Sequence, residues 1–172
     1  TADSFSQSGW FQQNSGTTSN VSGITFIDHN TGYALATPLL KTTNGGFNWF
    51  RFTPHTQTFG YYRDVKFIDE NTGFTLRYSG GYYKTTNGGA NWFTPQIINN
   101  QNYSIDFFNS NTGIMFGKTS NASVLFKTTN AGVNWSNNVI GSVYFNDVHF
   151  INENKGWAAG SGIDSLIQMT TN

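Results

Sequence analysis

The sequence predicts an all-β protein built from about four copies of one short unit, and two repeated phrases at a regular spacing predict it. One phrase occurs as TTNGGFNW, TTNGGANW and TTNAGVNW, and its last residues, Trp49, Trp92 and Trp135, are separated by two steps of 43 residues. A second phrase, close to FIDxNTG, begins at positions 26, 67, 107 and 150. Units that recur at such a period stack on their copies, because one unit alone cannot bury its apolar face.

Each unit has the pattern of antiparallel strands. The first strand alternates apolar and polar residues up to Phe26 or its equivalents, and the polar turn that follows contains the Asn and Gly that tolerate positive φ. Second strands are expected at 33–36, 74–78, 114–117 and 157–160, and third strands at 39–42, 82–85, 125–128 and 166–170. A fourth strand opens at the tryptophan. No apolar stripe of helical period lasts ten residues, so the pattern predicts four-stranded blades of a β-propeller.

The whole chain, 1–172, is expected to be one propeller domain or a segment of one, with repeats at about 21–53, 63–95, 104–138 and 147–172. A further strand at 10–14 would complete the last blade beside 166–170, with Trp10 in the place of the other tryptophans. This pairing could occur within one chain or between two. A closed four-blade ring, pairing with another chain and a segment of a longer array all remain open.

The eight-letter phrase resembles the Asp-box, whose pattern is Ser/Thr-x-Asp/Asn-x-Gly-x-Thr/Asn-Trp. Together with FIDxNTG it is similar to the Asp-box (BNR-like) propeller repeats of the photosystem II stability/assembly-factor-like type in secreted bacterial proteins. The resemblance implies a structural turn between the third and fourth strands, in which the amide binds local backbone and the tryptophan packs between strands. It assigns to this turn Asn44, Gly46, Trp49, Asn87, Gly89, Trp92, Asn130, Gly132 and Trp135. Asp-boxes also occur in sialidases, xyloglucanases and sortilin-type receptors, so the box carries no activity of its own.

Composition argues against several classes of protein. The net charge is zero and only 10% of residues are charged, so neither a basic footprint for nucleic acid nor a polybasic membrane patch is expected. No apolar run is long enough to span a bilayer, and no membrane insertion is expected. The chain has no cysteine, which excludes disulfides and thiolate metal sites. Low charge with many Asn, Thr, Ser and Gly residues suits a secreted or cell-surface bacterial protein, and the first ten residues contain no signal-peptide pattern.

Residues with catalytic chemistry are few. A sialidase needs three arginines from separate blades, but the three arginines of this chain, Arg51, Arg63 and Arg77, fall within a stretch shorter than one repeat. A paired-carboxylate glycosidase needs two facing acids, but Asp69 and Glu70 are expected to be solvated turn residues. One position of the inner strands holds Thr25, Lys66, Asp106 and His149, which we expect to line the central channel with Lys66 paired to Asp106; acid–base catalysis is the alternative. Asp64 and Asp147, with Gly23 and Ser104, are expected at the channel mouth. No metal and no cofactor are expected, because the histidines lack ligand spacing.

The loops opposite the repeated turns differ from one repeat to the next and are rich in tyrosine, amides and arginine, which suits sugar rings or an extended protein segment. The sequence therefore predicts a non-enzymatic extracellular module that binds a glycan or a surface protein through this variable face. The alternatives are a structural or self-assembling module that exchanges strands with copies of itself, and a glycoside-processing enzyme domain. The candidate ligand-binding residues are Tyr61, Tyr62, Arg63, Arg77, Tyr78, Tyr82, Tyr103 and Tyr144.

Overall fold

The computed structural model describes residues 9, 12–52, 62–93, 101–161 and 165–170. Within these ranges the chain forms strands, turns and bends but no helix. The strands make four antiparallel sheets in chain order, and in each sheet a strand pairs with the next one along the chain. The described residues therefore include no helix with the length and apolarity needed to cross a membrane.

The strand bounds follow the predicted repeats. The first sheet contains β1 (Gly23–Phe26), β2 (Gly32–Leu35), β3 (Leu39–Thr42) and β4 (Phe50–Phe52), and the second contains β5 (Tyr62–Phe67), β6 (Gly73–Arg77) and β7 (Tyr82–Thr85). The third sheet contains β8 (Gln101–Phe107), β9 (Gly113–Lys118), β10 (Ser123–Thr128) and β11 (Ser136–Gly141), and the last contains β12 (Tyr144–Asn152), β13 (Lys155–Ser161) and β14 (Ser165–Thr170).

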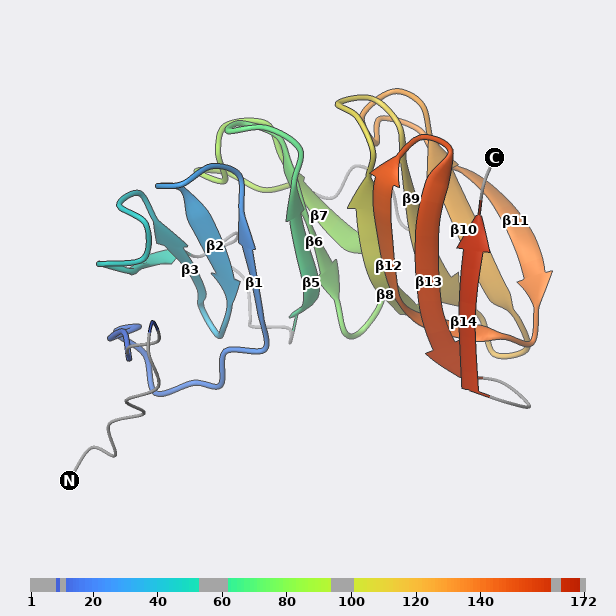
Figure 1. The fold of residues 1–172 in the computed structure, drawn as a ribbon, viewed down its shortest axis with the longest axis horizontal. Coiled ribbons are helices and arrows are strands. Elements are labelled where there is room, and N and C mark those ends of the chain that lie inside the picture. The colour runs from blue at the N-terminus through green and yellow to red at the C-terminus, as the bar shows by residue number, and fades with distance from the viewer. Residues whose placement is uncertain (1–8, 10–11, 53–61, 94–100, 162–164, 171–172) are drawn as a thin grey trace.

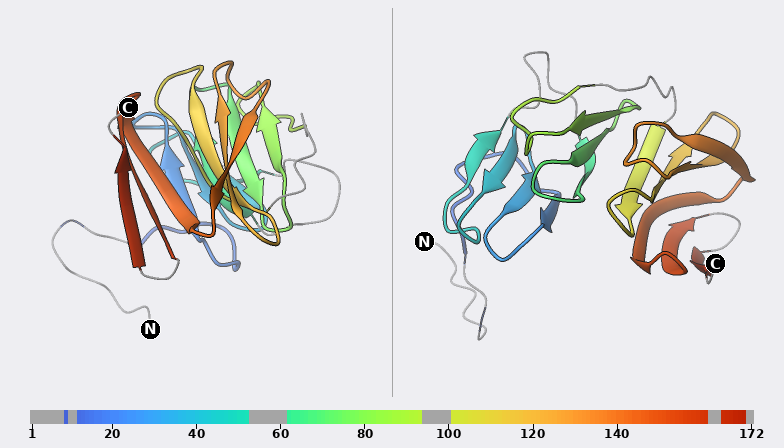
Figure 2. Two further views of the ribbon diagram at one scale, coloured as in Figure 1. Left: turned by 90° about the vertical axis from the view of Figure 1, so that its right-hand side faces the viewer. Right: turned by 90° about the horizontal axis from the view of Figure 1, so that it is seen from above.

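The four sheets follow one another along an arc, and the first and last sheets lie at its two ends (Figures 1 and 2). The first strand of each sheet is innermost, and β1 contacts β5, β5 contacts β8, and β8 contacts β12. Antiparallel meanders placed side by side around a common axis in this way are the blades of a β-propeller. The predicted fold class, an all-β propeller with about four blades in this chain, is confirmed.

The predicted fourth strands are present where the structure describes their positions. They are β4 in the first sheet and β11 in the third, whereas the second sheet has a single bridge between Lys84 and Phe93. For the predicted strand at 10–14, Trp10 lies outside the described residues. Residues 12–14 form no strand, and Gln13 lies against Gly46 of the first sheet instead of beside β14. Pairing of this segment with the last blade of another chain stays a prediction.

Aromatic side chains fill the spaces between neighbouring sheets. Tyr33 of β2 stacks on Phe67 of β5 with ring centroids 3.6 Å apart, and Trp92 meets the edge of Phe67 at 5.9 Å. The next interface repeats this arrangement, because Phe74 stacks on Phe107 at 4.9 Å and Trp135 lies edge-on to Phe107 at 6.1 Å. Full burial of a large apolar side chain is worth about 1.5–3 kcal/mol, so these contacts hold the arc together.

Candidate functional site

The TTN turns, 42–49, 85–92 and 128–135, form the same hydrogen bonds in three sheets. In the first turn the Thr42 hydroxyl donates to Asn44 Oδ1 at 3.0 Å, and the Gly46 N–H donates to Thr42 Oγ1 at 2.9 Å. The Asn48 N–H donates to Asn44 Oδ1 at 2.9 Å. The second and third turns repeat these three bonds with lengths between 2.8 and 3.1 Å. The polar atoms of each turn are therefore used to close the turn itself.

Each TTN turn also binds the FIDxNTG turn of its own sheet. The backbone N–H of Gly45, Gly88 or Ala131 donates to the carbonyl oxygen of an asparagine in that turn, at 2.8 Å in all three sheets. In the FIDxNTG turns, the side chain at the Asp position closes the turn. In the second sheet, for example, Asp69 Oδ1 accepts the Asn71 N–H at 2.8 Å. Both kinds of turn thus lie at one end of the propeller, as predicted, and Asp69 is a turn residue.

At the opposite end, three of the four inner strands begin with a β-bulge. The register of β5 with β6 skips Arg63, that of β8 with β9 skips Tyr103, and that of β12 with β13 skips Asn146. A bulge leaves one residue outside the ladder and redirects its side chain. The equivalent position in the first sheet is Ser22, directly before β1. The bulges were not predicted, because the alternation of apolar and polar residues does not mark them.

These strand starts enclose a hollow of about 230 Å³ near the propeller axis, here named the central hollow. All four sheets contribute two consecutive residues to its wall. These pairs are Ser22 and Gly23, Arg63 and Asp64, Tyr103 and Ser104, and Asn146 and Asp147, and Ile24, Leu35 and Val65 also line the hollow. The sequence predicted the second member of each pair at the channel mouth, and the structure confirms that these positions meet there.

Two carboxylates share one serine in the wall of the central hollow. Ser104 Oγ lies 3.0 Å from Asp64 Oδ2 and 3.1 Å from Asp147 Oδ1, so its single proton can be donated to either carboxylate. Asp64 Oδ2 also accepts the Ile105 N–H at 3.0 Å, and Asp64 Oδ1 accepts the Val65 N–H at 2.8 Å. Burial raises the pKa of Asp64, although these hydrogen bonds oppose the rise. Asp64 thus fastens β5 to β8.

An arginine lies between two tyrosine rings beside the central hollow. The guanidinium carbon of Arg63 is 4.2 Å from the ring centroid of Tyr78 and 4.2 Å from that of Tyr103. Tyr78 comes from the turn after β6 and is largely exposed, whereas Tyr103 comes from β8 of the next sheet. Each cation–π contact is worth about 0.5–1 kcal/mol at an exposed site. The three side chains therefore form an ordered group across two sheets, here named the Arg63 sandwich.

The other candidate residues lie in several places. Tyr62 pairs with Arg77 across β5 and β6, next to the sandwich, and Arg77 lies 5.4 Å from the Tyr83 ring. The ring centroid of Tyr144 on β12 lies 4.0 Å from Lys118 Nζ on β9 of the third sheet. Tyr61 lies outside the described residues.

The prediction for Tyr82 needs correction. Its side chain is 1% exposed and packs with Phe74 and Trp135 in the core between the second and third sheets. The apolar face of β7 turns inward at this residue, so Tyr82 offers no surface to a ligand. The polar loop before it misled the sequence prediction, which placed Tyr82 with its exposed neighbours.

A second charged group lies deeper along the inner strands. Lys66 Nζ is 2.5 Å from Asp106 Oδ1, which confirms the predicted pair, and His149 Nδ1 is 3.6 Å from Asp106 Oδ2. Asp106 Oδ2 also accepts the Phe150 N–H at 2.6 Å, so this buried carboxylate fastens β8 to β12. Thr25 is the fourth residue at this position. Among the described residues, no three His, Asp or Glu side chains gather as metal ligands would.

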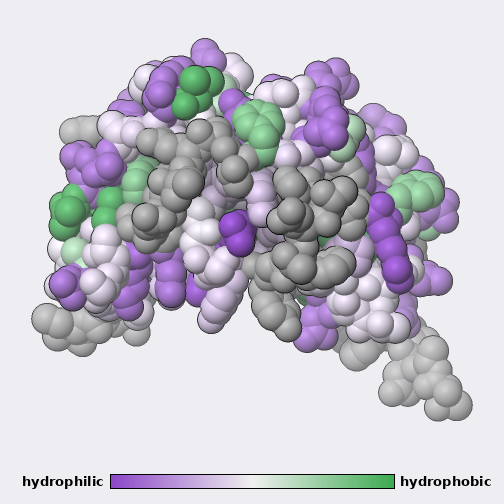
Figure 3. Space-filling model, turned by 180° about the vertical axis from the view of Figure 1, so that it is seen from behind, coloured by the Kyte–Doolittle hydropathy of each residue, from purple (hydrophilic) through white to green (hydrophobic). Residues whose placement is uncertain are grey.

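Among the residues that the structure describes, the face opposite to that of Figure 1 shows no large apolar area (Figure 3). Apolar side chains on that face are scattered among polar ones (Figure 3). Single exposed apolar residues are normal on a soluble surface and indicate no binding site by themselves. The central hollow and the Arg63 sandwich are therefore the candidate site.

Comparison with known proteins supports the fold. No protein-family model matches the chain, and no curated protein matches it by sequence. Among solved structures, an ancestral GH74 enzyme is similar with a TM-score of 0.72 and 21% identity, over 92% of this chain and 24% of that chain. YCF48 from Cyanidioschyzon merolae is similar with a TM-score of 0.67 and 11% identity, over 88% of this chain and 50% of that chain.

The computationally designed Ika4 protein is similar with a TM-score of 0.66 and 10% identity, over 95% of this chain and 98% of that chain. At these identities the likeness shows the fold alone. The chain spans 24% of the GH74 enzyme and 50% of YCF48. The chain is thus similar in fold to the propellers of a glycoside hydrolase and of YCF48.

Proposed function

We propose that this chain is a non-enzymatic binding module, secreted or at the cell surface, that holds a glycan or an extended protein segment at the end of the propeller with the central hollow. The observation that carries the proposal is the Arg63 sandwich, in which the guanidinium lies 4.2 Å from each of two tyrosine rings. The sandwich stands beside a polar hollow to which all four sheets contribute.

The sandwich suits binding for three physical reasons. Tyrosine faces pack against sugar rings and apolar side chains, and the phenol hydroxyl adds a polar contact. A guanidinium presents several N–H donors in a fixed plane, which fits carboxylate, hydroxyl and carbonyl oxygens. Because Arg63 is already held between Tyr78 and Tyr103, these three side chains lose less conformational entropy when a ligand binds than three mobile side chains would.

The hydrogen bonding of the acidic residues supports a non-enzymatic role. A paired-carboxylate glycosidase needs one free acid and one free base or nucleophile on either side of the scissile bond. Both oxygens of Asp64 accept backbone N–H groups, and both oxygens of Asp106 do the same, whereas Asp147 accepts the Ser104 hydroxyl and the Val148 N–H through Oδ1. We also propose that the TTN turns are Asp-boxes, because their Thr and Asn side chains close the turn as that motif implies.

The proposal is tested by screening the purified chain against a glycan array and a library of displayed peptides. The strongest ligand is then measured with Arg63→Ala and Tyr78→Ala, and each variant is expected to bind at least about tenfold more weakly. Phe47→Ala is the matched control, because Phe47 is an exposed aromatic residue in a TTN turn at the other end. Equal affinity of wild type and Arg63→Ala would place the site elsewhere, and the absence of any ligand in both screens would contradict the proposal.

A further inference from the structure

One apolar face of the first sheet is uncovered, although the same face is buried in the second and third sheets. Ile24 is 61% exposed and Phe26 is 43% exposed. The equivalent residues of the second sheet, Val65 and Phe67, are each 5% exposed. This face of the first sheet is named the open face, and it consists of Val21, Ile24, Phe26 and Trp49 with the buried side chains of Ala34 and Leu40 beneath them.

Inside the arc, this apolar face of each sheet packs against the preceding sheet. Tyr33, Leu35 and Leu39 of the first sheet form one core cluster with Val65, Phe67 and Trp92 of the second. Phe74, Leu76 and Tyr82 of the second sheet cover Ile105, Phe107 and Trp135 of the third in the same way. Two complementary faces therefore recur along the arc, and among the described residues no sheet precedes the first one to cover the open face.

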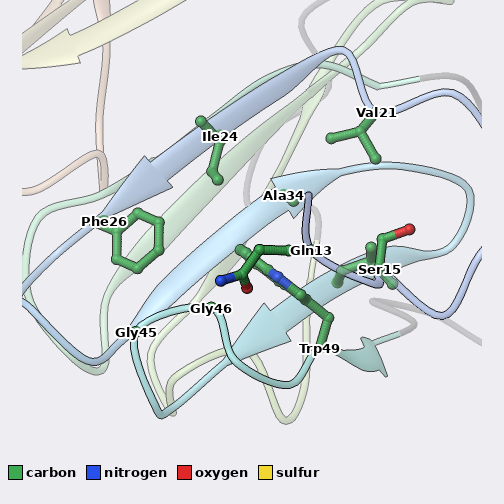
Figure 4. A pocket seen from close by; sticks show the side chains of 10 residues that line it. Gln13, Ser15, Val21, Ile24, Phe26, Ala34, Gly45, Gly46 and Trp49 are labelled. Carbon is green, nitrogen blue, oxygen red and sulfur yellow. The ribbon is translucent and has the colours of Figure 1, made fainter. Parts of the chain in front are cut away.

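The open face is hollowed. Its residues line a pocket of about 290 Å³, with Ile24 and Phe26 on one side and Trp49 on the other (Figure 4). Gln13 lies inside this pocket beside Trp49, and Ser15 also lines it, but Ile24 and Phe26 stay 61% and 43% exposed (Figure 4). Trp49 meets the edge of Phe26 at 6.2 Å, as Trp92 meets Phe67 at 5.9 Å. The exposed face of the first sheet thus has the same aromatic arrangement as the face of the second sheet that packs against a neighbouring sheet.

The opposite end of the arc presents the complementary face. In the last sheet, Trp157 and Ala159 hold the β13 positions that correspond to Tyr33 and Leu35, and Ala159 is exposed. Ala159 pairs with Ile167 in the same register in which Leu76 pairs with Tyr82. No later sheet covers this face within the described ranges.

We propose that the open face binds a second copy of this chain, head to tail, through the last-sheet face around Trp157 and Ala159. The occupant is a second copy, because the first two interfaces inside the arc pack a face like the open face against a face like that of the last sheet. Another copy of the chain presents such a last-sheet face. The first and last sheets of one chain lie at opposite ends of the arc (Figure 2). A head-to-tail contact of this kind closes into a ring or continues as a filament, depending on the rotation between copies.

The first test is the mass of the chain in solution, measured by sedimentation over a range of concentrations. The wild-type chain is expected to form dimers or larger assemblies. Ile24→Lys and Ala159→Lys are each expected to give monomers that remain folded, because both side chains are exposed in the single chain. Val139→Lys is the matched control on β11, an exposed apolar residue outside both faces, and it is expected to assemble as wild type does.

The second test mixes the two monomeric variants. The Ile24→Lys chain keeps an intact last-sheet face, and the Ala159→Lys chain keeps an intact open face. An equal mixture is therefore expected to form a 1:1 dimer that cannot grow further, because its remaining faces both carry lysine. Phe26→Gln replaces Ile24→Lys if the latter lowers the melting temperature. A wild-type chain that stays monomeric at all concentrations, or a mixture that stays monomeric, would overturn the proposal.

Discussion

At the end of the propeller with the TTN turns, three sheets form the same three hydrogen bonds with lengths of 2.8 to 3.1 Å. At the end with the central hollow, one equivalent position carries four different residues, Ser22, Arg63, Tyr103 and Asn146. A turn closes only with particular hydrogen-bond donors and acceptors, so its residues repeat. The position at the hollow has no such requirement, so its residues can differ. The comparison indicates that the repeated end stabilises the blades, and the proposed function assigns recognition of the partner to the variable end.

The largest expected effect is the loss of a tryptophan that follows a TTN turn. Trp135→Ala removes an indole that contacts Phe74, Tyr82 and Phe107, and this change is expected to lower the free energy of unfolding by about 3–5 kcal/mol. Trp49→Ala should cost less, because Trp49 lies on the uncovered face of the first sheet. Chemical denaturation of both variants measures the difference. Equal losses would show that the covering sheet contributes nothing to the tryptophan site.

A smaller loss is expected from the threonine of a TTN turn. Thr85→Val removes the hydroxyl that accepts the Gly89 N–H at 2.8 Å and donates to Asn87 Oδ1 at 3.0 Å. A buried donor without a partner costs about 1–3 kcal/mol, so the melting temperature should fall. Thr86→Val is the control, because Thr86 is the exposed neighbour in the same turn. If the two variants melted together, the turn hydrogen bonds would not stabilise the blade.

The third TTN turn departs from the others at one backbone position. Ala131 has φ of +53°, where the second turn has Gly88 with φ of +62°. A side chain in this left-handed region costs about 1 kcal/mol, so Ala131→Gly should raise the free energy of unfolding by about that amount. Gly88→Ala should lower it by more, because the added Cβ would lie 2.9 Å from the Glu70 carbonyl oxygen. Opposite signs in urea unfolding are expected, and equal signs would contradict this explanation.

The smallest expected effect concerns Asp64 at the variable end. Burial raises the pKa of Asp64 above its ordinary value of 3.8, so the folded chain keeps this proton to a higher pH than the unfolded chain. The contribution of Asp64 to stability is therefore greatest below pH 3.8 and is lost as the pH rises through its folded pKa. The difference in unfolding free energy between wild type and Asp64→Asn should show this slope. A difference that rises with pH would mean that the hydrogen bonds outweigh burial.

Much of the fold could be predicted because the sequence phrases that form the strands and turns are repeated. The third strands 39–42 and 82–85 have their predicted bounds, and the register of the inner strands predicted the pair of Lys66 with Asp106. The hydrogen bonds of the turns follow from the Thr, Asn and Gly of each TTN phrase. A local structure that recurs three times in one sequence can be predicted from that sequence, because each copy supports the interpretation of the others.

The rest depends on contacts between sheets, which the sequence does not encode locally. Arg63 and Tyr103 were candidates, but the bulges that bring them to the central hollow depend on how β5 and β8 pair with their neighbours. Tyr82 was placed on the surface because its preceding loop is polar, yet it packs against the next sheet. The exposure of Ile24 likewise depends on packing between sheets, because no sheet among the described residues covers it.

The central claim, that stability resides at the repeated end and recognition at the variable end, is tested most directly by measuring two quantities on two variants. For the ligand found by screening, both melting temperature and affinity are measured for Thr85→Val and Arg63→Ala. Thr85→Val should lower the melting temperature and leave affinity unchanged, whereas Arg63→Ala should weaken binding about tenfold with little change in melting temperature. A loss of affinity in Thr85→Val as large as that in Arg63→Ala would contradict the account.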